Sequence, residues 1–446
     1  MDFANVALQI PEVLLPQAGV DLTKWAVVAC DQFTSQPEYW EKVAASTGGA
    51  PSTLDLIFPE VYLGKGHDSE RIDRINANMS RYLDTGLLVS PGAGLIYLER
   101  QTAHGNLRKG LIVAVDLEAY DYRRGAASLV RATEGTVLDR LPPRVKIRER
   151  AVLELPHIML LIDDPEATVI QPLAAQTGQL TKLYDTDLLL GGGHVTGYLV
   201  NDPAVLTAVS RALTRLAEPD YFNRKYGLNG ASPLLFAVGD GNHSLATAKA
   251  VWEKLKGRAE IDRERHPARY ALVELVNLHD PGLQFEPIHR VLFQVSGAAF
   301  NAYLTKTLAP LGLTRETPPN EAVMLEQLSR RTRCRPGSQT FGMVTADGAT
   351  LVTVARPRHN LTVGTVQKLL DDWVRGHPES MVDYIHGAAV GAALGVKPGN
   401  IGFFLPPIAK SDLFKTVIVD GALPRKTFSM GAAAEKRYYL ECRRIG

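Results

Sequence analysis

Residues 233–252 read Pro233-Leu-Leu-Phe-Ala-Val-Gly-Asp-Gly-Asn-His-Ser-Leu-Ala-Thr-Ala-Lys-Ala-Val-Trp252, which predicts a buried strand, a tight turn and a helix. Gly239 and Gly241 allow positive φ and a close approach of the backbone to a ligand. The first N–H groups of the helix, near Asn242 to Leu245, carry partial positive charge, so phosphate is the expected ligand. The stretch is not a Walker loop, because the four-residue spacer and the Gly-Lys pair are absent.

The same turn contains a carboxylate, which conflicts with binding of a bare phosphate. Asp240 would repel an oxyanion unless a metal ion or a shared proton lies between them. A Mg²⁺ ion bound by Asp240 together with a polyphosphate would resolve that conflict, and His243 could donate to phosphate or carry a proton. An equally simple interpretation is that Asp240 is an N-cap worth about 1 kcal/mol and that His243 is a surface histidine.

The whole chain has the composition of an ordinary folded protein. Its 446 residues predict two or three domains at roughly 150 residues each. With 45% apolar and 22% charged residues, it is neither disordered nor collagenous nor a disulfide framework. Lys and Arg number 49 against 48 Asp and Glu, so the net charge of +1 builds in no attraction to nucleic acid or anionic lipid. We therefore expect a small-molecule substrate, whereas the oligomeric state is not defined.

Cysteine spacing and the first residues bear on the compartment. Cys30, Cys334 and Cys442 lie far apart and lack the spacing of a zinc or redox motif, so a reducing compartment is expected. The start, Met1-Asp2-Phe3-Ala4-Asn5, has an acid where a signal peptide needs a basic region. No apolar run approaches the roughly 18 residues of a membrane span. These features predict a cytoplasmic protein.

Apolar runs alternate with amphipathic stretches along the chain, which predicts an α/β (α+β) fold with a mixed sheet. The clearest strands are expected at 25–30, 94–98, 111–115, 234–238 and 270–278, and helices at 69–85, 202–216 and 245–256. We expect a main body over residues 1–295 that carries the phosphate site. A second domain or large insertion would span 296–400, with a helix, a second helix and a hairpin at 340–354. Residues 401–446 would return to the main body as strands and turns.

Further charged groups could complete an anion pocket. Arg131 and Arg140 are candidate phosphate clamps, and Glu134 is a candidate base or metal ligand. The basic residues from Arg144 to Arg150 have a helical pattern and more simply form a solvated face.

Asp31 follows an expected strand and precedes a helix start at Pro37, where it could activate a hydroxyl, bind a metal or make an Asx turn. His289 and Arg290 are expected at a strand start, and Arg425, Lys426 and Thr427 lie in a later polar turn. Each of these groups could equally be an ordinary turn. The histidines show neither HExxH nor His-x-His spacing, and Gly-x-Ser-x-Gly is absent.

Taken in order, these segments resemble one family, the domain of unknown function numbered 1015, which is distantly similar to the ParB/sulfiredoxin fold and to free-serine kinases. The family pattern has Pro-Tyr-Asp, Arg-x-His-Glu, Asp-Gly-His-His-Arg, Thr-His-Arg and Met-Pro-x-Lys-Ser/Thr. The corresponding segments here are Ala29-Cys30-Asp31, Arg131-Ala132-Thr133-Glu134, Asp240-Gly241-Asn242-His243-Ser244, Ile288-His289-Arg290 and Leu423-Pro424-Arg425-Lys426-Thr427.

The resemblance implies a ParB/sulfiredoxin-like core with an additional α/β domain, and a central motif that handles phosphate at a helix N-terminus. Asn242 and Ser244 replace a histidine and an arginine of that motif, which would leave the phosphate clamp to Arg131, Arg290 or Lys426. Asn and Ser side chains can still donate hydrogen bonds.

The expected function is therefore phosphoryl transfer between a donor (ATP, ADP or pyrophosphate) and a small hydroxylated metabolite, with free L-serine favoured by the resemblance. Mg²⁺ would bridge donor oxygens, and either Asp31 or Glu134 would accept the hydroxyl proton. The expected phosphate ligands come from four segments: Arg131; Gly239, Gly241, Asn242 and Ser244; His289 and Arg290; and Lys426. The alternative is a ParB-like nucleotide-binding module that recruits a protein or DNA without turning over a metabolite. The near-neutral charge argues against DNA.

Overall fold

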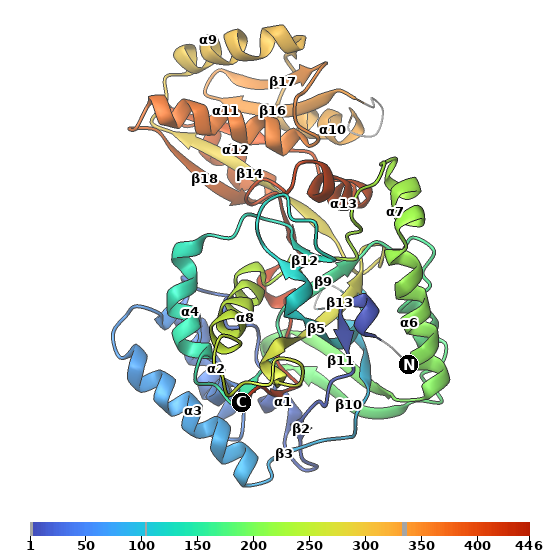
Figure 1. Cartoon of the computed structure of the whole chain (residues 1–446). Coiled ribbons are helices and arrows are strands. Elements are labelled where there is room, and N and C mark those ends of the chain that lie inside the picture. Colours follow the sequence, from blue (N-terminus) through green and yellow to red (C-terminus); the bar gives the residue numbers. More distant parts are fainter. Residues whose placement is uncertain (1–2, 103–104, 332–336) are drawn as a thin grey trace. The chain divides into compact units, whose positions relative to one another are not determined.

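The computed structural model describes residues 3–102, 105–331 and 337–446, and the chain divides into two units. Unit 1 comprises Met1–Gln284 and Met430–Gly446, and unit 2 comprises Phe285–Ser429. Both units contain helices and sheets, so the expected mixed α/β class is confirmed (Figure 1). The insertion expected at 296–400 lies inside unit 2, which extends beyond it at both ends.

Unit 1 is built on one large mixed sheet. β9 and β13, β7 and β12, and β6 and β7 pair in parallel, and the other neighbours are antiparallel. In sheet order the strands are β10 (Thr181–Leu188), β11 (Gly193–Val200), β4 (Leu95–Gln101), β5 (Leu107–Asp116), β13 (Tyr270–Asn277), β9 (Met159–Ile162), β12 (Phe236–Asp240), β7 (Val130–Ala132) and β6 (Tyr120–Asp121), and β1 (Leu8–Gln9) also pairs with β5.

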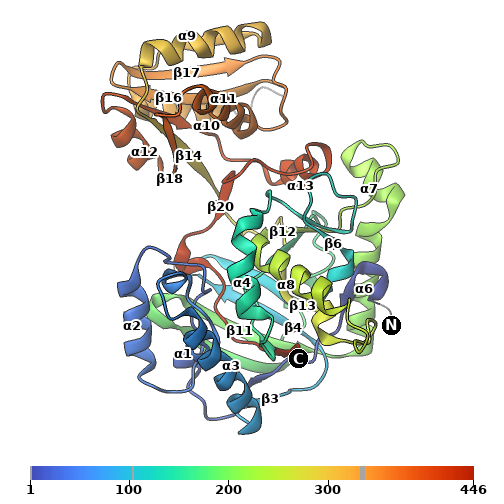
Figure 2. The ribbon, with the colours of Figure 1, turned by 60° about the vertical axis from the view of Figure 1, so that its left-hand side comes forward.

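Alternate residues of this sheet enter two separate apolar cores, as the two-residue period of a strand requires. On β5, Leu111 and Val113 belong to the core that includes α6 (Pro203–Ala217) and α8 (Asn242–Leu255). Ile112 belongs to the core on the other face, which includes α1 (Leu22–Trp25), α2 (Pro37–Thr47) and α3 (Asp68–Asp84). The sheet of unit 1 is therefore buried between two layers of helices (Figure 2).

The other α-helices and strands of unit 1 are short. They are α4 (Leu141–Arg148), which packs beside α8, α5 (Gln171–Ala174), α7 (Pro219–Tyr226), and the strand pairs β2 (Leu15–Pro16) with β3 (Leu88–Val89) and β8 (Leu153–Glu154) with β21 (Arg443–Arg444).

Unit 2 has its own sheet. Its strands in order are β15 (Leu313–Glu316), β17 (Gly348–Val354), β16 (Gln339–Thr345), β19 (Asn400–Phe404), β14 (Phe285–Phe293) and β18 (Met381–His386), with β20 (Phe428–Met430) on β14. Its helices are α9 (Gly297–Leu308), α10 (Glu321–Arg331), α11 (Thr362–Gly376), α12 (Ala388–Gly395) and α13 (Lys410–Val419). The expected hairpin at 340–354 is confirmed as β16 and β17.

Three local predictions were wrong. Of the strand expected at 25–30, Trp25 ends α1 and Cys30 lies in a turn, and the residues between them form only an isolated bridge between Val28 and Tyr438. Their backbone partners are in the C-terminal segment rather than in a sheet, since the Ala29 amide donates to the Arg437 carbonyl and the Tyr439 amide donates to the Val27 carbonyl. The segment expected to hold only strands and turns after residue 401 also contains α13. His289 and Arg290 lie within β14 and not at its start.

The C-terminal segment, Met430–Gly446, is tied into unit 1 at several points. Cys442 exchanges backbone hydrogen bonds with Leu14, Trp25 donates from Nε1 to the carbonyl of Leu440 at 2.9 Å, and β21 pairs with β8. Within the described ranges, no helix has the length and apolar character needed to cross a membrane.

Glu154 is buried on β8 and binds the C-terminal segment through Arg443, so a substitution at Glu154 measures how much this contact stabilises the fold. It accepts hydrogen bonds from Arg443 Nε at 2.7 Å, Arg148 Nη2 at 2.5 Å and the Leu272 amide at 2.8 Å. Burial raises the pKa of Glu154, but the two arginines outweigh burial and lower it overall. The carboxylate therefore contributes stability above its unfolded pKa, and that stability is lost as the pH falls through the lower folded pKa.

We expect Glu154→Gln to reduce the free energy of unfolding by about 3–5 kcal/mol at neutral pH, because it leaves buried guanidinium charge uncompensated. Urea denaturation measures the loss, which should shrink in acid. Glu253→Gln, at a surface glutamate paired with Lys249 and Lys256, should cost less than about 1 kcal/mol. Equal losses in the two variants would contradict this role of Glu154.

Candidate functional site

The strand, turn and helix expected from residues 233–252 are present as β12, Gly241 and α8. Gly241 has φ of 80°, and a Cβ there would lie 3.0 Å from the Cα of Ile158. The first intrahelical hydrogen bond of α8 is donated by Leu245 to the Gly241 carbonyl, so the amides of residues 242–244 precede it. Gly239 has no positive φ, and a Cβ there would approach Leu161 Cγ to 2.8 Å. It is required for sheet packing and not for the turn.

Asp240 is held by a lysine that the sequence analysis did not select. Its Oδ2 lies 3.0 Å from Lys436 Nζ, and its Oδ1 accepts the Gly241 amide at 3.0 Å. Burial raises the pKa of Asp240, but the charge of Lys436 and, to a smaller extent, that of His157 lower it by more than burial raises it. The pKa of Asp240 is therefore below its ordinary value. Asp240 is therefore an ionised carboxylate that fixes a lysine ammonium at the start of α8.

These contacts do not fit a protein-held Mg²⁺ ion. Both oxygens of Asp240 are already engaged, and the described part of the chain holds no group of three or more His, Cys, Asp or Glu side chains that could ligate a metal. The structure gives Asp240 an ammonium partner in place of the expected metal.

The first turn of α8 also carries a hydrogen-bonded chain of side chains. Ser244 Oγ lies 2.7 Å from His157 Nε2, and His157 Nδ1 lies 2.7 Å from the Tyr439 hydroxyl. That hydroxyl also accepts the Cys30 amide at 3.1 Å. If the Tyr439 proton is donated to Nδ1, the neutral imidazole donates from Nε2 to Ser244, and the Ser244 proton is left to point toward a ligand.

Asn242 and His243 contact the segment that follows β7. The Asn242 amide accepts from the Thr133 N–H and donates to Thr133 Oγ1, both at 3.3 Å, and Thr133 Oγ1 donates to the Val238 carbonyl at 2.6 Å. His243 Nε2 accepts the Val137 amide at 3.4 Å. The next residue after Thr133 is Glu134, so this candidate base lies close to the start of α8.

Asp31 lies in the same region of unit 1. It is partly exposed and accepts a hydrogen bond from Gln32 Nε2 at 2.9 Å. Burial raises the pKa of Tyr439 well above its ordinary value, and the charge of Asp31 adds to this effect. The charge of Asp31 therefore acts on Tyr439, which belongs to the hydrogen-bonded series Tyr439, His157 and Ser244.

The structure places the expected arginine clamp elsewhere. Arg131 is buried, and it donates from Nε to the Ser128 carbonyl at 2.8 Å and from Nη2 to those of Ser232 and Pro233 at 2.8 and 3.2 Å. Arg140, the other expected clamp, is exposed, and its carbonyl accepts a hydrogen bond from Arg144 Nη1 at 2.7 Å. Arg144, which was expected on a solvated face, forms a bidentate ion pair with Glu60 at 2.8 and 2.6 Å. Arg131 and Arg144 therefore hold the backbone and neighbouring elements together, and neither is part of the candidate site.

The remaining expected ligands belong to unit 2. His289 is buried, its Nδ1 accepts the Leu405 amide at 3.3 Å, and burial lowers its pKa to about 4. Arg290 is fully buried and donates to Gln367 Oε1 and to the carbonyls of Ile288 and Arg425. Lys426 is exposed and has φ of 55°. The contacts of His289 and Arg290 stabilise unit 2 internally.

The candidate site therefore consists of residues of unit 1 around the start of α8. Of the expected residues it brings together Asp31, Glu134, Asp240, Gly241, Asn242, His243 and Ser244. His157, Lys436 and Tyr439 were missed. No local motif marks any of the three, since Lys436 and Tyr439 acquire their roles only when the C-terminal segment packs against α8, and His157 acquires its role only through its contacts with Tyr439 and Ser244.

Comparisons with known proteins support the family and little more. The family model described as "Protein of unknown function (DUF1015)" matches residues 14–373. No curated protein matches the chain. Among solved structures, a free serine kinase in complex with AMP is similar at 11% identity and a TM-score of 0.37, covering 74% of this chain and 90% of that one.

Two further solved structures show the same level of similarity. They are a conserved hypothetical protein from Pyrococcus furiosus (11% identity, TM-score 0.34, 74% and 90% coverage) and C-terminally truncated SbnI from Staphylococcus aureus (10% identity, TM-score 0.35, 72% and 83% coverage). Similarity at this level does not identify a substrate or a reaction, and the ParB/sulfiredoxin-like assignment stays a prediction.

The turn at Gly241 can be tested by adding a Cβ. We expect Gly241→Ala to lower the free energy of unfolding by about 1–3 kcal/mol, because alanine at φ of 80° is strained and its Cβ would press on Ile158. Gly178→Ala is the control, since a Cβ there meets no atom within 4 Å. Denaturant titration of both variants measures the costs, and a Gly241→Ala protein as stable as the control would contradict the turn geometry.

Proposed function

Because the chain belongs to the DUF1015 family, whose description names no reaction, we propose its function from the site itself: it transfers a phosphoryl group between a nucleotide or pyrophosphate and a small hydroxylated metabolite. Free L-serine is the favoured acceptor, on the family resemblance. The observation that carries the proposal is that the first amides of α8, the Lys436 ammonium and the Ser244 hydroxyl meet at one place. Helix amides, an ammonium and a hydroxyl together bind phosphoryl oxygens.

In this proposal Lys436 supplies the positive charge that the motif itself lacks. Its side chain is 12% exposed and lies against Asp240, so it is held in place before a ligand arrives. Asp240 then acts as a positioning residue, because its charge is neutralised by the same ammonium that binds the phosphoryl group. Any Mg²⁺ that enters with a nucleotide belongs to the substrate, and no protein-held metal is needed.

In this proposal Ser244 donates a hydrogen bond to a phosphoryl oxygen, and His157 orients the Ser244 hydroxyl. A Ser244 hydroxyl that accepts from His157 can donate to a phosphoryl oxygen, and this hydrogen bond strengthens as charge builds up in the transition state. His157 is fixed on its other side by Tyr439, which keeps the imidazole oriented. His243 remains a secondary candidate, because its Nε2 already accepts the Val137 amide.

We propose Asp31 as the base that accepts the proton of the substrate hydroxyl. Its carboxylate is partly exposed and acts electrostatically on Tyr439, so a substrate between Asp31 and Ser244 would contact both. Glu134 is the other candidate, since it follows the residue that binds Asn242. Asp31→Asn and Glu134→Gln separate the two, because only the variant at the base should lose turnover with little change in donor affinity.

The activity is tested on the purified full chain with Mg²⁺, L-serine and ATP, ADP, CTP or pyrophosphate in turn, by detecting O-phosphoserine and by running the reverse direction. Lys436→Met and Ser244→Ala should each lower kcat/KM by at least about tenfold, because each removes a group that contacts the phosphoryl oxygens. Lys254→Met is the matched control, since this exposed lysine at the far end of α8 pairs only with Glu149 in the described contacts.

Two outcomes would contradict the proposal. Full activity of both Lys436→Met and Ser244→Ala would show that these residues do not form the active site. If no donor supports transfer while the protein binds DNA tightly and with strong salt dependence, the ParB-like binding module becomes the better account.

A further inference from the structure

The hairpin formed by β10 and β11 holds a histidine between two aspartates. His194, on β11, lies 2.8 Å through Nδ1 from Asp187 Oδ1 and 2.7 Å through Nε2 from Asp185 Oδ1. Both aspartates belong to β10, and the strand register places Asp187 directly opposite His194. The His194 side chain is 36% exposed, so it can exchange protons with solvent. One histidine therefore links two strands through both of its ring nitrogens.

These two contacts require both ring nitrogens of His194 to carry a proton. An ionised carboxylate only accepts hydrogen bonds, so each nitrogen must donate. Only the imidazolium has two N–H groups, whereas the neutral ring has one donor and one acceptor. The hydrogen bond to Asp187 and the contact with Asp185 raise the pKa of His194 above its ordinary value, although burial acts in the opposite direction. Geometry and charge thus both favour the protonated ring.

The two aspartates differ in the partners that remain when His194 loses its proton. Lys182 Nζ lies 2.6 Å from Asp185 Oδ2, and Thr196 Oγ1 donates to Asp185 Oδ1 at 3.4 Å. In the described part of the chain, His194 is the only hydrogen-bonding or ion-pairing partner of the Asp187 carboxylate. A neutral ring can donate to just one of the two carboxylates, so one contact between the strands becomes repulsive. The other side chains that the strand register places on this face are Gln101 and Glu99 of β4 and Lys109 of β5.

The link matters because β10 is an edge strand of the unit 1 sheet. Its single neighbour in the sheet order is β11, and the register between them shifts between Lys182 and Tyr184. A strand that is hydrogen-bonded on one side opens more readily than a central strand. Cross-strand side-chain contacts are therefore a substantial part of what holds β10 in place.

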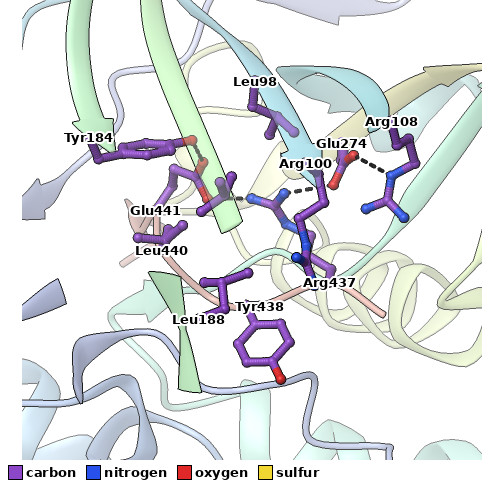
Figure 3. A pocket seen from close by; sticks show the side chains of 11 residues that line it. Leu98, Arg100, Arg108, Tyr184, Leu188, Glu274, Arg437, Tyr438, Leu440 and Glu441 are labelled. Carbon is purple, nitrogen blue, oxygen red and sulfur yellow. Dashed lines mark hydrogen bonds and ion pairs between the residues drawn. The ribbon is translucent and has the colours of Figure 1, made fainter. Parts of the chain in front are cut away.

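The opposite face of β10 contacts the C-terminal segment. The ring of Tyr184 lies over β11, where a Cβ at Gly197 would approach its Cζ to 2.1 Å, so its position depends on the pairing of the two strands. The Tyr184 hydroxyl donates to Glu441 at 2.5 Å (Figure 3). The carbonyl of Leu189, directly after β10, accepts the Tyr438 hydroxyl at 3.1 Å. A displacement of β10 would therefore disturb the contacts of the C-terminal segment.

We propose that His194 is a pH-sensitive clamp, which fastens β10 to β11 while its ring is protonated and loosens β10 together with the C-terminal segment when the ring is neutral. The direction follows from the raised pKa of the folded state. The clamp stabilises the hairpin fully below the unfolded pKa of His194, and this stabilisation is lost as the pH rises through the higher folded pKa. The loosening is thus expected on the alkaline side of the ordinary histidine pKa of about 6.5.

The test is hydrogen–deuterium exchange of the full chain at about pH 5.5 and about pH 9, on either side of the ordinary histidine pKa, with rates corrected for the intrinsic effect of pH. In the wild type, peptides that cover β10 and Met430–Gly446 should lose at least about threefold in protection at the higher pH, because exchange follows local stability.

Substitutions at His194 fix the clamp in one state. His194→Arg keeps a positive charge and several N–H donors, so β10 should stay protected at both pH values. His194→Gln carries no charge, so protection should be low at both. If His194→Gln does not fold, Asp187→Asn is measured instead, and its loss of protection should begin at a lower pH than in the wild type. His67→Gln is the matched control, since His67 pairs with Glu70 on α3 and should leave the exchange of β10 unchanged.

NMR titration of the histidine rings gives a second measurement. The signal of His194 is identified by its absence in His194→Arg. The pKa of His194 should lie above its ordinary value in the wild type and fall in Asp187→Asn, because this variant removes the carboxylate that raises the pKa most.

These measurements separate a clamp from a histidine with a purely structural role. The same difference between His194→Gln and the wild type at both pH values would indicate a structural role and overturn the proposal. A wild-type pKa of His194 at or below its ordinary value would overturn it as well. Loosening confined to β10, with unchanged exchange of Met430–Gly446, would overturn the link to the C-terminal segment. None of these outcomes depends on phosphoryl transfer, because no substrate is present.

Discussion

The neutralisation of Glu274 is the constraint on which the architecture of unit 1 depends. This carboxylate lies on the central strand β13 with no exposed surface. An isolated charge in such a place would unfold the protein or take up a proton, so it must have cationic partners. One partner, Arg108, comes from the neighbouring strand, but the shorter contact is made by Arg437, near the end of the chain. The C-terminal segment must therefore return to the sheet before the core of unit 1 is complete.

The same contact fixes the candidate site. Arg437 donates from Nε to the Pro156 carbonyl at 2.8 Å. Lys436, which precedes Arg437, holds Asp240, and His157, which follows Pro156, is hydrogen-bonded to Ser244. Tyr439, two residues beyond Arg437, completes the contact with His157. One buried network thus positions a lysine, a histidine and a tyrosine at the start of α8, although none of them belongs to the helix or its turn.

Local patterns explain what could be predicted from the sequence. The apolar strand, the two glycines and the amphipathic helix between residues 233 and 252 specify their own conformations, so β12 and α8 were identified correctly. The segment from Trp25 to Cys30 has the same apolar character, but its partner is the C-terminal segment and not a neighbouring strand. Arg131 illustrates the corresponding limit for the site: a guanidinium beside a glycine-containing loop has the composition of a phosphate clamp, yet main-chain carbonyls bind it.

The departures from the family pattern are understandable in the same physical terms. Ser244, where the pattern has arginine, brings no charge, but its hydroxyl is hydrogen-bonded to His157, and the nearby cation comes from Lys436. Asn242, where the pattern has histidine, joins α8 to Thr133 through both ends of its amide and so keeps Glu134 beside the helix. A buried or half-buried charge that arrives from a distant segment must be held by a counter-charge, and Asp240 does this for Lys436. Such a site therefore requires a local balance of charge, whichever segment supplies each member.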